Sequence, residues 1–303
     1  MEKALITKIV KDSILDGPGC RYVIFLKGCN LACPWCHNPE TQSGQQEILT
    51  YPKFCIRCGN CVEAAPTGHP QDVMPVEVDN SRVEDYKACV ERCPTNALEF
   101  AGKEYSTGEI ISDMAKYEII YKKTGGGITL SGGDPLCNPE FSMEILQKAS
   151  ERNFHTAVDT AGCFAWEEME HIAPYTDLWL YDMKHVYDPQ FGSSQSISNL
   201  LKLANQRENS IYVRIPIIPY FNDMDNILEQ MVYILEKARP GIKQVDILPF
   251  HSYGKEKYDA LNRDFHFKNQ KDLEEENLDH ILTFFYRKLP EEMIQTGRNM
   301  IHG

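Results

Sequence analysis

The sequence predicts an α/β fold in which six βα units form a partial barrel. Three observations support this fold. Short β-branched or aromatic segments alternate with helical patterns along most of the chain, the first such segment leads into a cysteine loop, and a segment with its own cysteine spacing interrupts the alternation. We therefore expect a barrel domain formed by residues 1–49 and 103–303, with residues 50–102 as an insert.

The order of the predicted elements indicates a parallel sheet. Strands are predicted at 21–26, 127–130, 155–159, 178–183, 211–215 and 244–248. Helical patterns lie at 108–122, 139–152, 166–172, 197–207, 226–238 and 273–287. Strands that alternate with helices pair in parallel, and such barrels carry their chemistry at the C-terminal ends of the strands.

The first predicted strand is followed by Cys29, Cys33 and Cys36, which have the spacing CxxxCxxC. Three thiolates at this spacing bind one 4Fe-4S cluster and leave its fourth iron open for a substrate or cofactor, so we expect a catalytic cluster here. The alternative is structural zinc, which prefers four closed ligands, usually as two CxxC pairs. His37 would be the fourth zinc ligand, whereas beside a cluster it would act as a neighbouring donor.

The residues around this loop carry a resemblance to a known family. A DGPG turn begins at Asp16, Trp35 precedes the last loop cysteine, and His37-Asn38-Pro39-Glu40 follows it. This order resembles the opening of the radical S-adenosylmethionine superfamily, and within it the activating enzymes of glycyl radical enzymes, relatives of pyruvate formate-lyase activase. The resemblance covers nearly the whole chain and implies a partial (βα)6 barrel of the radical SAM type.

The resemblance also implies the reaction. A reduced cluster would cleave S-adenosylmethionine, and the resulting 5′-deoxyadenosyl radical would remove a Cα hydrogen from a glycine of a partner glycyl radical enzyme. The chain would thus be an oxidoreductase of anaerobic metabolism, with Asp16 facing its protein substrate and a flavodoxin or ferredoxin as reductant. An alternative is a radical enzyme that acts on a small molecule or peptide. A plain ferredoxin-like electron carrier has no use for an open iron.

The strand predicted at 127–130 runs into Gly132, Gly133 and Asp134. Two glycines after a strand allow the backbone to approach a ligand, and a carboxylate can accept a hydrogen bond from an ammonium group. In the family the equivalent segment ends in Gly-Gly-Glu and contacts the amino group of S-adenosylmethionine. By resemblance these three residues have that role, with an acid one methylene shorter.

Polar residues also stand at the ends of the later strands, which converge on one mouth in a barrel. By resemblance, the ligands of a monovalent cation beside the cofactor would be Asp159, Thr160 and Asp182. The other residues that the resemblance places at S-adenosylmethionine are Trp35, His37, Lys184, Arg214 and His251. Taken singly, each of the strand-end residues is more typical of a salt-bridged residue of the rim than of a ligand, but together and in this order they favour the site.

The insert contains Cys55, Cys58 and Cys61 in CxxCxxC spacing, followed by Cys89 and Cys93-Pro94. This pattern resembles a bacterial two-cluster ferredoxin, in which the last cysteine of each run ligates the cluster of the other run. Crossed ligation leaves one complete set, so we expect one auxiliary 4Fe-4S cluster held by Cys55, Cys58, Cys61 and Cys93. A structural zinc is the alternative. Cys89 is then either an alternative ligand or a buried thiol.

Composition excludes other classes. With 44 acidic and 31 basic residues, the formal net charge is −13, which argues against nucleic-acid binding. The sequence has no apolar run long enough to cross a bilayer and no signal-peptide pattern at its start, so we expect a cytoplasmic protein that does not bind membranes. Most of the 11 cysteines have metal-type spacings, which require a reducing compartment.

Overall fold

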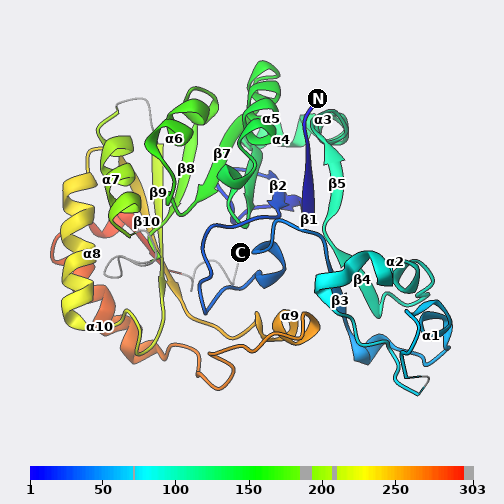
Figure 1. The fold of residues 1–303 in the computed structure, drawn as a ribbon. Helices are drawn as coiled ribbons and strands as arrows, with labels where there is room; N and C mark the ends of the chain where they lie inside the picture. The colour runs from blue at the N-terminus through cyan, green and yellow to red at the C-terminus, as the bar shows by residue number, and fades with distance from the viewer. Residues whose placement is uncertain (71, 185–192, 207–209, 297–303) are drawn as a thin grey trace.

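The computed structural model describes residues 1–70, 72–184, 193–206 and 210–296 (Figure 1). In these residues a nine-stranded sheet has the order β11-β10-β9-β8-β7-β6-β2-β1-β5, and β3 and β4 form a separate two-stranded sheet. The strands of the large sheet are β1 (Lys3–Ser13), β2 (Arg21–Leu26), β5 (Lys103–Ser106), β6 (Gly127–Gly132), β7 (His155–Thr160), β8 (Leu178–Asp182), β9 (Ser210–Ile217), β10 (Ile242–Pro249) and β11 (Ile294–Thr296).

The large sheet is mixed, so the prediction of a purely parallel sheet was wrong in part. All six predicted strands are present, and β2 and β6 to β11 pair in parallel. β1 pairs antiparallel with both β2 and β5. Residues 14–20 between β1 and β2 are too few for the crossover that a parallel pair requires, so these strands form a hairpin.

Helices pack on one face of the large sheet. These helices are α3 (Thr107–Ala115), α4 (Glu118–Thr124), α5 (Pro139–Glu151), α6 (Trp166–Ile172), α7 (Ser193–Ala204), α8 (Asp225–Ala238) and α10 (Glu275–Tyr286). Alternate strand residues such as Ile24, Trp179 and Val213 join the helices in one buried core. Side chains of the intervening strand positions therefore point to the opposite face, where the polar residues of the strand ends gather.

The predicted helices differ from the observed ones at two places. The segment 108–122 is two helices, because the chain turns at Lys116 and Tyr117 although no glycine or proline stands there. The turn lets the Tyr121 hydroxyl of α4 donate to the Lys11 carbonyl of β1 at 2.8 Å. α7 begins at Ser193, four residues before the predicted start at 197, and residue 207 of that prediction lies outside the described residues.

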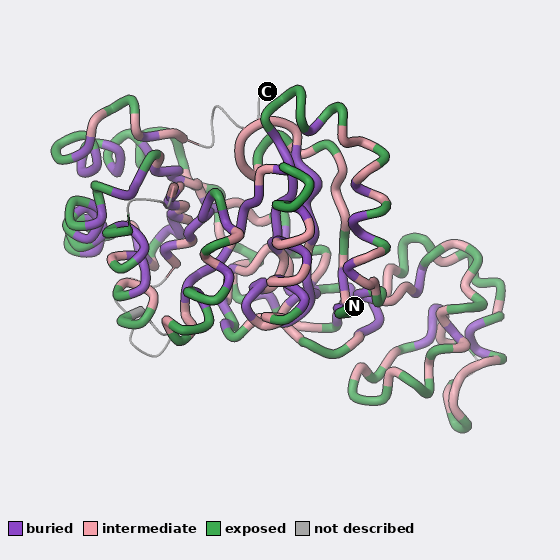
Figure 2. Tube along the Cα trace, turned by 90° about the horizontal axis from the view of Figure 1, so that it is seen from above, coloured by how far each residue is buried: buried purple, intermediate pink, exposed green. Residues whose placement is uncertain are grey.

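A small lobe forms between the cysteine loop and β5. It contains β3 (Glu47–Thr50), β4 (Leu98–Ala101), α1 (Asn60–Ala64) and α2 (Val83–Glu91). It has its own buried cluster, which includes Ile48, Val76 and Leu98. Figure 2 shows this group of buried residues apart from the larger core. The remaining helix, α9 (Lys255–Ala260), contacts both β3 and the short 3-10 helix η1 (Pro39–Thr41). Among the described helices none is long and apolar enough to cross a bilayer.

Candidate iron-sulfur and cofactor site

The cysteine loop is closed at its base directly after β2. The Gly28 N–H donates to the Thr41 carbonyl at 2.8 Å, and the Cys29 N–H donates to the Gln42 carbonyl at 3.0 Å. Gly28 has a φ of +105°, a conformation that favours glycine. Inside the loop the Leu31 N–H donates to Cys29 Sγ at 3.4 Å. The loop thus holds its cysteines in a fixed backbone frame.

The three loop thiols lie in one buried group with Leu31, Trp35 and residues of the later loops. Burial raises the pKa of Cys29 and of Cys33 to about 12, and it raises the pKa of Cys36 as well. The Lys184 ammonium opposes the shift at each thiol. Thiolates in this position require a bound cation, since a coordinating thiol must lose its proton, and these residues therefore fit an iron-sulfur cluster.

Within the described ranges, no three side chains of His, Cys, Asp or Glu are placed to hold a single metal ion.

Charged side chains gather on the open face at the ends of β7, β8 and β9. Arg214 Nη1 lies 3.3 Å from Asp159 Oδ2, and Lys184 Nζ lies 2.7 Å from Asp182 Oδ2. Register places Arg214 directly beside Asp182 in the sheet. Burial, followed by the Asp182 charge, raises the pKa of Asp159 to about 7. Four of the five strand-end residues that sequence analysis expected at this mouth therefore lie together.

Asp16 joins this group from the β1–β2 connection. Arg214 Nη2 lies 3.5 Å from Asp16 Oδ1 and donates to the Leu15 carbonyl at 2.8 Å. The Thr129 hydroxyl donates to the Asp16 carbonyl at 2.7 Å, which holds the turn against β6. The DGPG turn is thus tied to the same charged group as the strand ends.

Asp134 is almost completely buried, and three neighbouring residues donate hydrogen bonds to its carboxylate. Its carboxylate accepts from Thr160 Oγ1 at 2.8 Å, from the Ala161 N–H at 3.0 Å and from the Leu136 N–H at 3.1 Å. Burial raises its pKa to about 6, against the effect of these donors. Asp134 therefore links the end of β6 to the end of β7, and the Thr160 hydroxyl is directed at Asp134.

At Gly132 and Gly133 the end of β6 packs closely against β2 and the start of the cysteine loop. A Cβ at Gly132, whose φ is +113°, would lie 2.2 Å from the Leu26 nitrogen, and one at Gly133 would lie 2.1 Å from the Gly28 oxygen. We expected the glycines to allow approach to a ligand. Their close contact with β2 and the cysteine loop gives a packing reason that suffices for both.

Aromatic rings line the other side of the cysteine loop. The His37 ring stacks on the His251 ring with centroids 4.0 Å apart, and His37 Nε2 lies 3.0 Å from the His251 carbonyl oxygen. Burial lowers the pKa of His37 to about 4, so the ring is neutral near pH 7. The Trp35 ring packs edge-on against Phe221, with centroids 4.4 Å apart. The loops after β2, β9 and β10 are therefore joined beside Cys36.

In the small lobe, four cysteines line one cavity, and these are Cys55, Cys58, Cys61 and Cys93. Burial alone would raise the pKa of Cys93, but the N–H groups of Thr95, Leu98 and Ala97 lower it overall. Cys89 does not line the cavity, and its buried thiol donates to the Cys61 carbonyl at 3.3 Å. Of the two alternatives for Cys89, the geometry favours the buried thiol.

Two residues of the charged group were missed in the sequence analysis. Ser131 donates to Asp159 Oδ2 at 2.7 Å, and Asp246 lies buried on β10 in register with Arg214. Asp246 is the single acid inside an apolar strand, and this pattern could have identified it. Ser131 directly precedes Gly132, and the sequence pattern drew attention only to the glycines and Asp134 of this segment.

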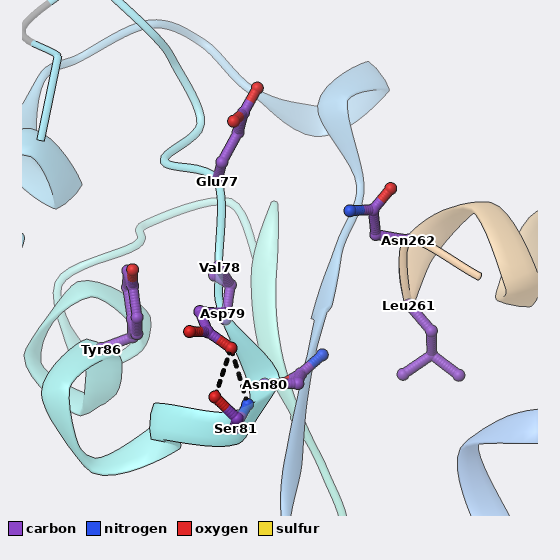
Figure 3. A pocket seen from close by; sticks show the side chains of 8 residues that line it. All are labelled: Glu77, Val78, Asp79, Asn80, Ser81, Tyr86, Leu261 and Asn262. Atoms are coloured by element: carbon purple, nitrogen blue, oxygen red, sulfur yellow. Dashed lines mark hydrogen bonds between the residues drawn. The ribbon is translucent and has the colours of Figure 1, made fainter.

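A cavity of about 510 Å³ lies between the small lobe and the end of α9, and none of the predicted site residues lines it (Figure 3). Asp79 at this cavity accepts from the Ser81 N–H at 2.9 Å and from its hydroxyl at 2.7 Å, which caps a short helix. These bonds give Asp79 a structural role.

The buried cysteine loop and the charged strand ends define an iron-sulfur enzyme with a cofactor site at the C-terminal edge of its sheet. Residues 15–207 match a family model described as a 4Fe-4S single cluster domain. The chain is 34% identical over 277 residues to the isethionate sulfite-lyase activating enzyme of Desulfovibrio desulfuricans, covering 87% of this chain and 88% of that one. It is 35% identical to the benzylsuccinate synthase activating enzyme of Thauera aromatica, covering 87% and 83%.

A third relative is the trans-4-hydroxy-L-proline dehydratase activating enzyme of Clostridioides difficile, which is 32% identical to this chain. The match covers 93% of this chain and 95% of the relative. The chain belongs to the activating enzymes of glycyl radical enzymes, a family within the radical S-adenosylmethionine superfamily. The resemblance found in the sequence is therefore confirmed. The protein is an oxidoreductase that uses a 4Fe-4S cluster and S-adenosylmethionine, and its substrate is a glycyl radical enzyme.

Proposed function

We propose that Cys29, Cys33 and Cys36 hold the catalytic cluster of this activating enzyme and leave one iron for S-adenosylmethionine. The observation that carries the proposal is the closed loop that gathers these thiols in one buried site. The positive charge of Lys184 lowers the thiol pKa there, against the effect of burial. When bound, the cluster and S-adenosylmethionine supply reductive cleavage and the radical that removes a glycine Cα hydrogen from the partner enzyme.

The charged and aromatic residues around the loop would bind and orient the cofactor. Lys184 and Arg214 supply positive charge for its carboxylate, and the segment from Gly132 to Asp134 would receive its ammonium group. Trp35, His37 and His251 would pack along its remaining part, where the neutral stacked rings exclude water. The family resemblance implies these roles, and the charge and ring character of the side chains support them.

A monovalent cation beside the cofactor would bind Asp159, Thr160 and Asp182. Asp159 Oδ1 is buried and has no hydrogen-bond partner in the part of the chain that the structure describes. A buried carboxylate oxygen of this kind favours a cation as its partner. Thr160 would contribute its hydroxyl oxygen while its proton stays directed at Asp134.

The small lobe would carry one auxiliary 4Fe-4S cluster. Support comes from the cavity that Cys55, Cys58, Cys61 and Cys93 share, because crossed ligation selects the same four residues. Residues 50–102 would then be a ferredoxin-like insert in a partial (βα)6 barrel formed by residues 1–49 and 103–303. Electrons would come from a flavodoxin or ferredoxin in the cytoplasm.

Asp16 would contact the protein substrate. The neighbouring side chains of Ile14 and Leu15 are exposed by 59% and 47%, so the turn offers two adjacent apolar side chains for contact with a partner. The Arg214 bonds hold this turn beside the proposed cofactor site. A glycine loop of the partner could therefore meet the turn and the cofactor at once.

Cofactor binding by the open iron can be tested spectroscopically. Adding S-adenosylmethionine to the anaerobically reduced protein should change the electron paramagnetic resonance spectrum of its catalytic cluster. A variant in which the three loop cysteines are replaced by alanine should lose this cluster, whereas Cys20→Ala, outside both cysteine groups, should behave as wild type. A wild-type spectrum that does not respond to S-adenosylmethionine would refute the proposal.

A further inference from the structure

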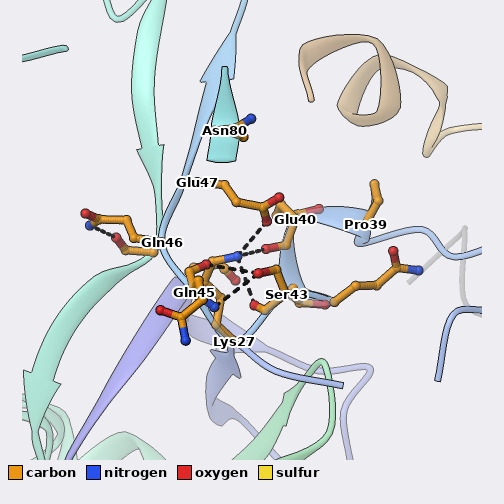
Figure 4. A network of polar contacts seen from close by, with 12 residues as sticks. Lys27, Pro39, Glu40, Ser43, Gln45, Gln46, Glu47 and Asn80 are labelled. Carbon is orange, nitrogen blue, oxygen red and sulfur yellow. Dashed lines mark hydrogen bonds and ion pairs between the residues drawn. The ribbon is translucent and has the colours of Figure 1, made fainter. Parts of the chain in front are cut away.

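Lys27, the residue that follows β2, has a completely buried side chain (Figure 4). Its ammonium group donates to the Glu40 carbonyl at 2.6 Å, to the Ser43 carbonyl at 3.1 Å and to Glu47 Oε2 at 2.9 Å. All three N–H groups of the ammonium therefore have acceptors. A buried charge with complete partners is rare in proteins and restricts the positions of everything it contacts.

Two further cations complete a group that we call the Lys27 clasp, which consists of Lys27, Glu40, Glu47, Lys257 and Arg263. Arg263 Nη2 lies 2.5 Å from Glu47 Oε1, and Lys257 Nζ lies 2.5 Å from Glu40 Oε1. Arg263 Nη1 also donates to the Pro39 carbonyl at 2.9 Å. The Glu47 carboxylate is thus shared between Lys27 and Arg263. Glu40 binds Lys257 through its carboxylate and Lys27 through its backbone carbonyl.

The clasp lies where the small lobe joins the sheet. Glu47 is the first residue of β3, where the chain enters the lobe, and Gly102 follows β4, where the chain leaves it. A Cβ at Gly102 would lie 2.7 Å from Lys27 Cδ, so the exit of the lobe packs directly on the lysine stem. Glu40 belongs to η1, which closes the cysteine loop. One side chain therefore touches the cysteine loop and both connections of the lobe.

We propose that Lys27 is a positioning residue that fixes the small lobe against the cysteine loop, and so sets the placement of the two proposed iron sites relative to each other. The effect on the distance between iron sites rests on the auxiliary cluster proposed above. The role of Lys27 in holding the lobe against the cysteine loop does not depend on that cluster. Removing the ammonium would leave Glu47 buried with Arg263 as its remaining partner, and the loss of one member of a buried pair loosens its surroundings.

The test compares Lys27→Met, which keeps the stem and removes the charge, with wild type. Hydrogen exchange of backbone amides in residues 38–43 and 47–50 should become at least about tenfold faster, the effect of losing one hydrogen bond to a charged group. Amides of β8 and β9 should be unchanged. Lys53→Met is the matched control, because it removes only exposed contacts, which are the Lys53–Glu256 pair between the lobe and α9 and the contact of Lys53 with the Phe54 ring. The double variant Lys27→Met/Glu47→Gln should recover part of the protection from exchange, because it also removes the charge of the buried Glu47.

A second measurement follows the two clusters. With both reduced, their magnetic interaction in the electron paramagnetic resonance spectrum should change in Lys27→Met, while each cluster alone keeps its own spectrum. If Lys27→Met is insoluble, Arg263→Met removes the outer cation of the same clasp and should give the same pattern. Unchanged exchange at residues 38–43 and 47–50 would overturn the proposal. An iron count of about four with faster exchange would instead refute the auxiliary cluster and leave the positioning role standing.

Discussion

Asp134→Asn tests the acid that is predicted to receive the ammonium group of S-adenosylmethionine. The carboxylate is buried, and it accepts from Thr160, Ala161 and Leu136. Asparagine has the same shape but only one accepting oxygen and no charge. The substitution therefore removes a charge-assisted acceptor from the end of β6 with little change in volume.

The expected magnitude follows from one lost hydrogen bond to a charged group. Such a bond contributes about 1.5 to 3 kcal/mol, so the dissociation constant of S-adenosylmethionine should rise about 10- to 150-fold. The free energy of unfolding should change by less than this value of about 1.5 to 3 kcal/mol. Burial raises the pKa of Asp134 to about 6, so the ionised acid already destabilises the fold near pH 8, and a neutral side chain removes that cost while it loses an acceptor.

Isothermal titration of the anaerobically reconstituted protein with S-adenosylmethionine measures the effect, and thermal unfolding at pH 8 serves as the stability readout. Asp134→Glu should bind nearly as well as wild type. Thr156→Val is a matched control, because it removes one buried hydroxyl of the same strand β7, bonded to the Tyr175 carbonyl, and leaves Asp134 and its donors in place. An unchanged dissociation constant in Asp134→Asn would assign Asp134 to the link between β6 and β7 alone.

Three further predictions concern the metals. The reconstituted protein should hold about eight irons, and replacing Cys29, Cys33 and Cys36 together by alanine should remove about half of them and all cleavage of S-adenosylmethionine; retained cleavage would contradict the catalytic assignment. Cys89→Ala should keep the full iron content, and a loss of about four irons would make Cys89 a ligand. A monovalent cation should bind more tightly at pH 8 than at pH 6. The pKa of Asp159 is raised to about 7, and the carboxyl group must lose its proton to bind a cation. In a cation titration, Asp159→Asn should abolish this pH dependence.

Local patterns predicted much of the fold and of the site. The strand before Cys29 was recognised from its β-branched and aromatic residues, and the later strands from their alternation with helices. The spacing of the lobe cysteines selected Cys93 over Cys89, and the shared cavity supports that choice. Spacing is informative in these cases because the ligands or the apolar faces come from residues close together in the chain.

The remaining features depend on contacts between distant residues. Thr160 meets Asp134 from 26 residues away, and Arg214 meets the Leu15 carbonyl from 199 residues away. Neither pairing has a local signal, because a lone Thr or Arg at a strand end has many possible partners. The antiparallel β1 and the buried position of Lys27 were likewise not predicted, since both depend on how the hairpin and the lobe pack onto the sheet.

Formation of a glycyl radical tests the central claim most directly. The reduced protein, S-adenosylmethionine and its partner glycyl radical enzyme should together give a doublet electron paramagnetic resonance signal, with 5′-deoxyadenosine formed in step. A peptide carrying the partner's glycine loop should compete. The variant lacking the three loop cysteines should give neither product. If 5′-deoxyadenosine accumulates with a small metabolite and no glycyl radical enzyme shows the doublet, the account is contradicted.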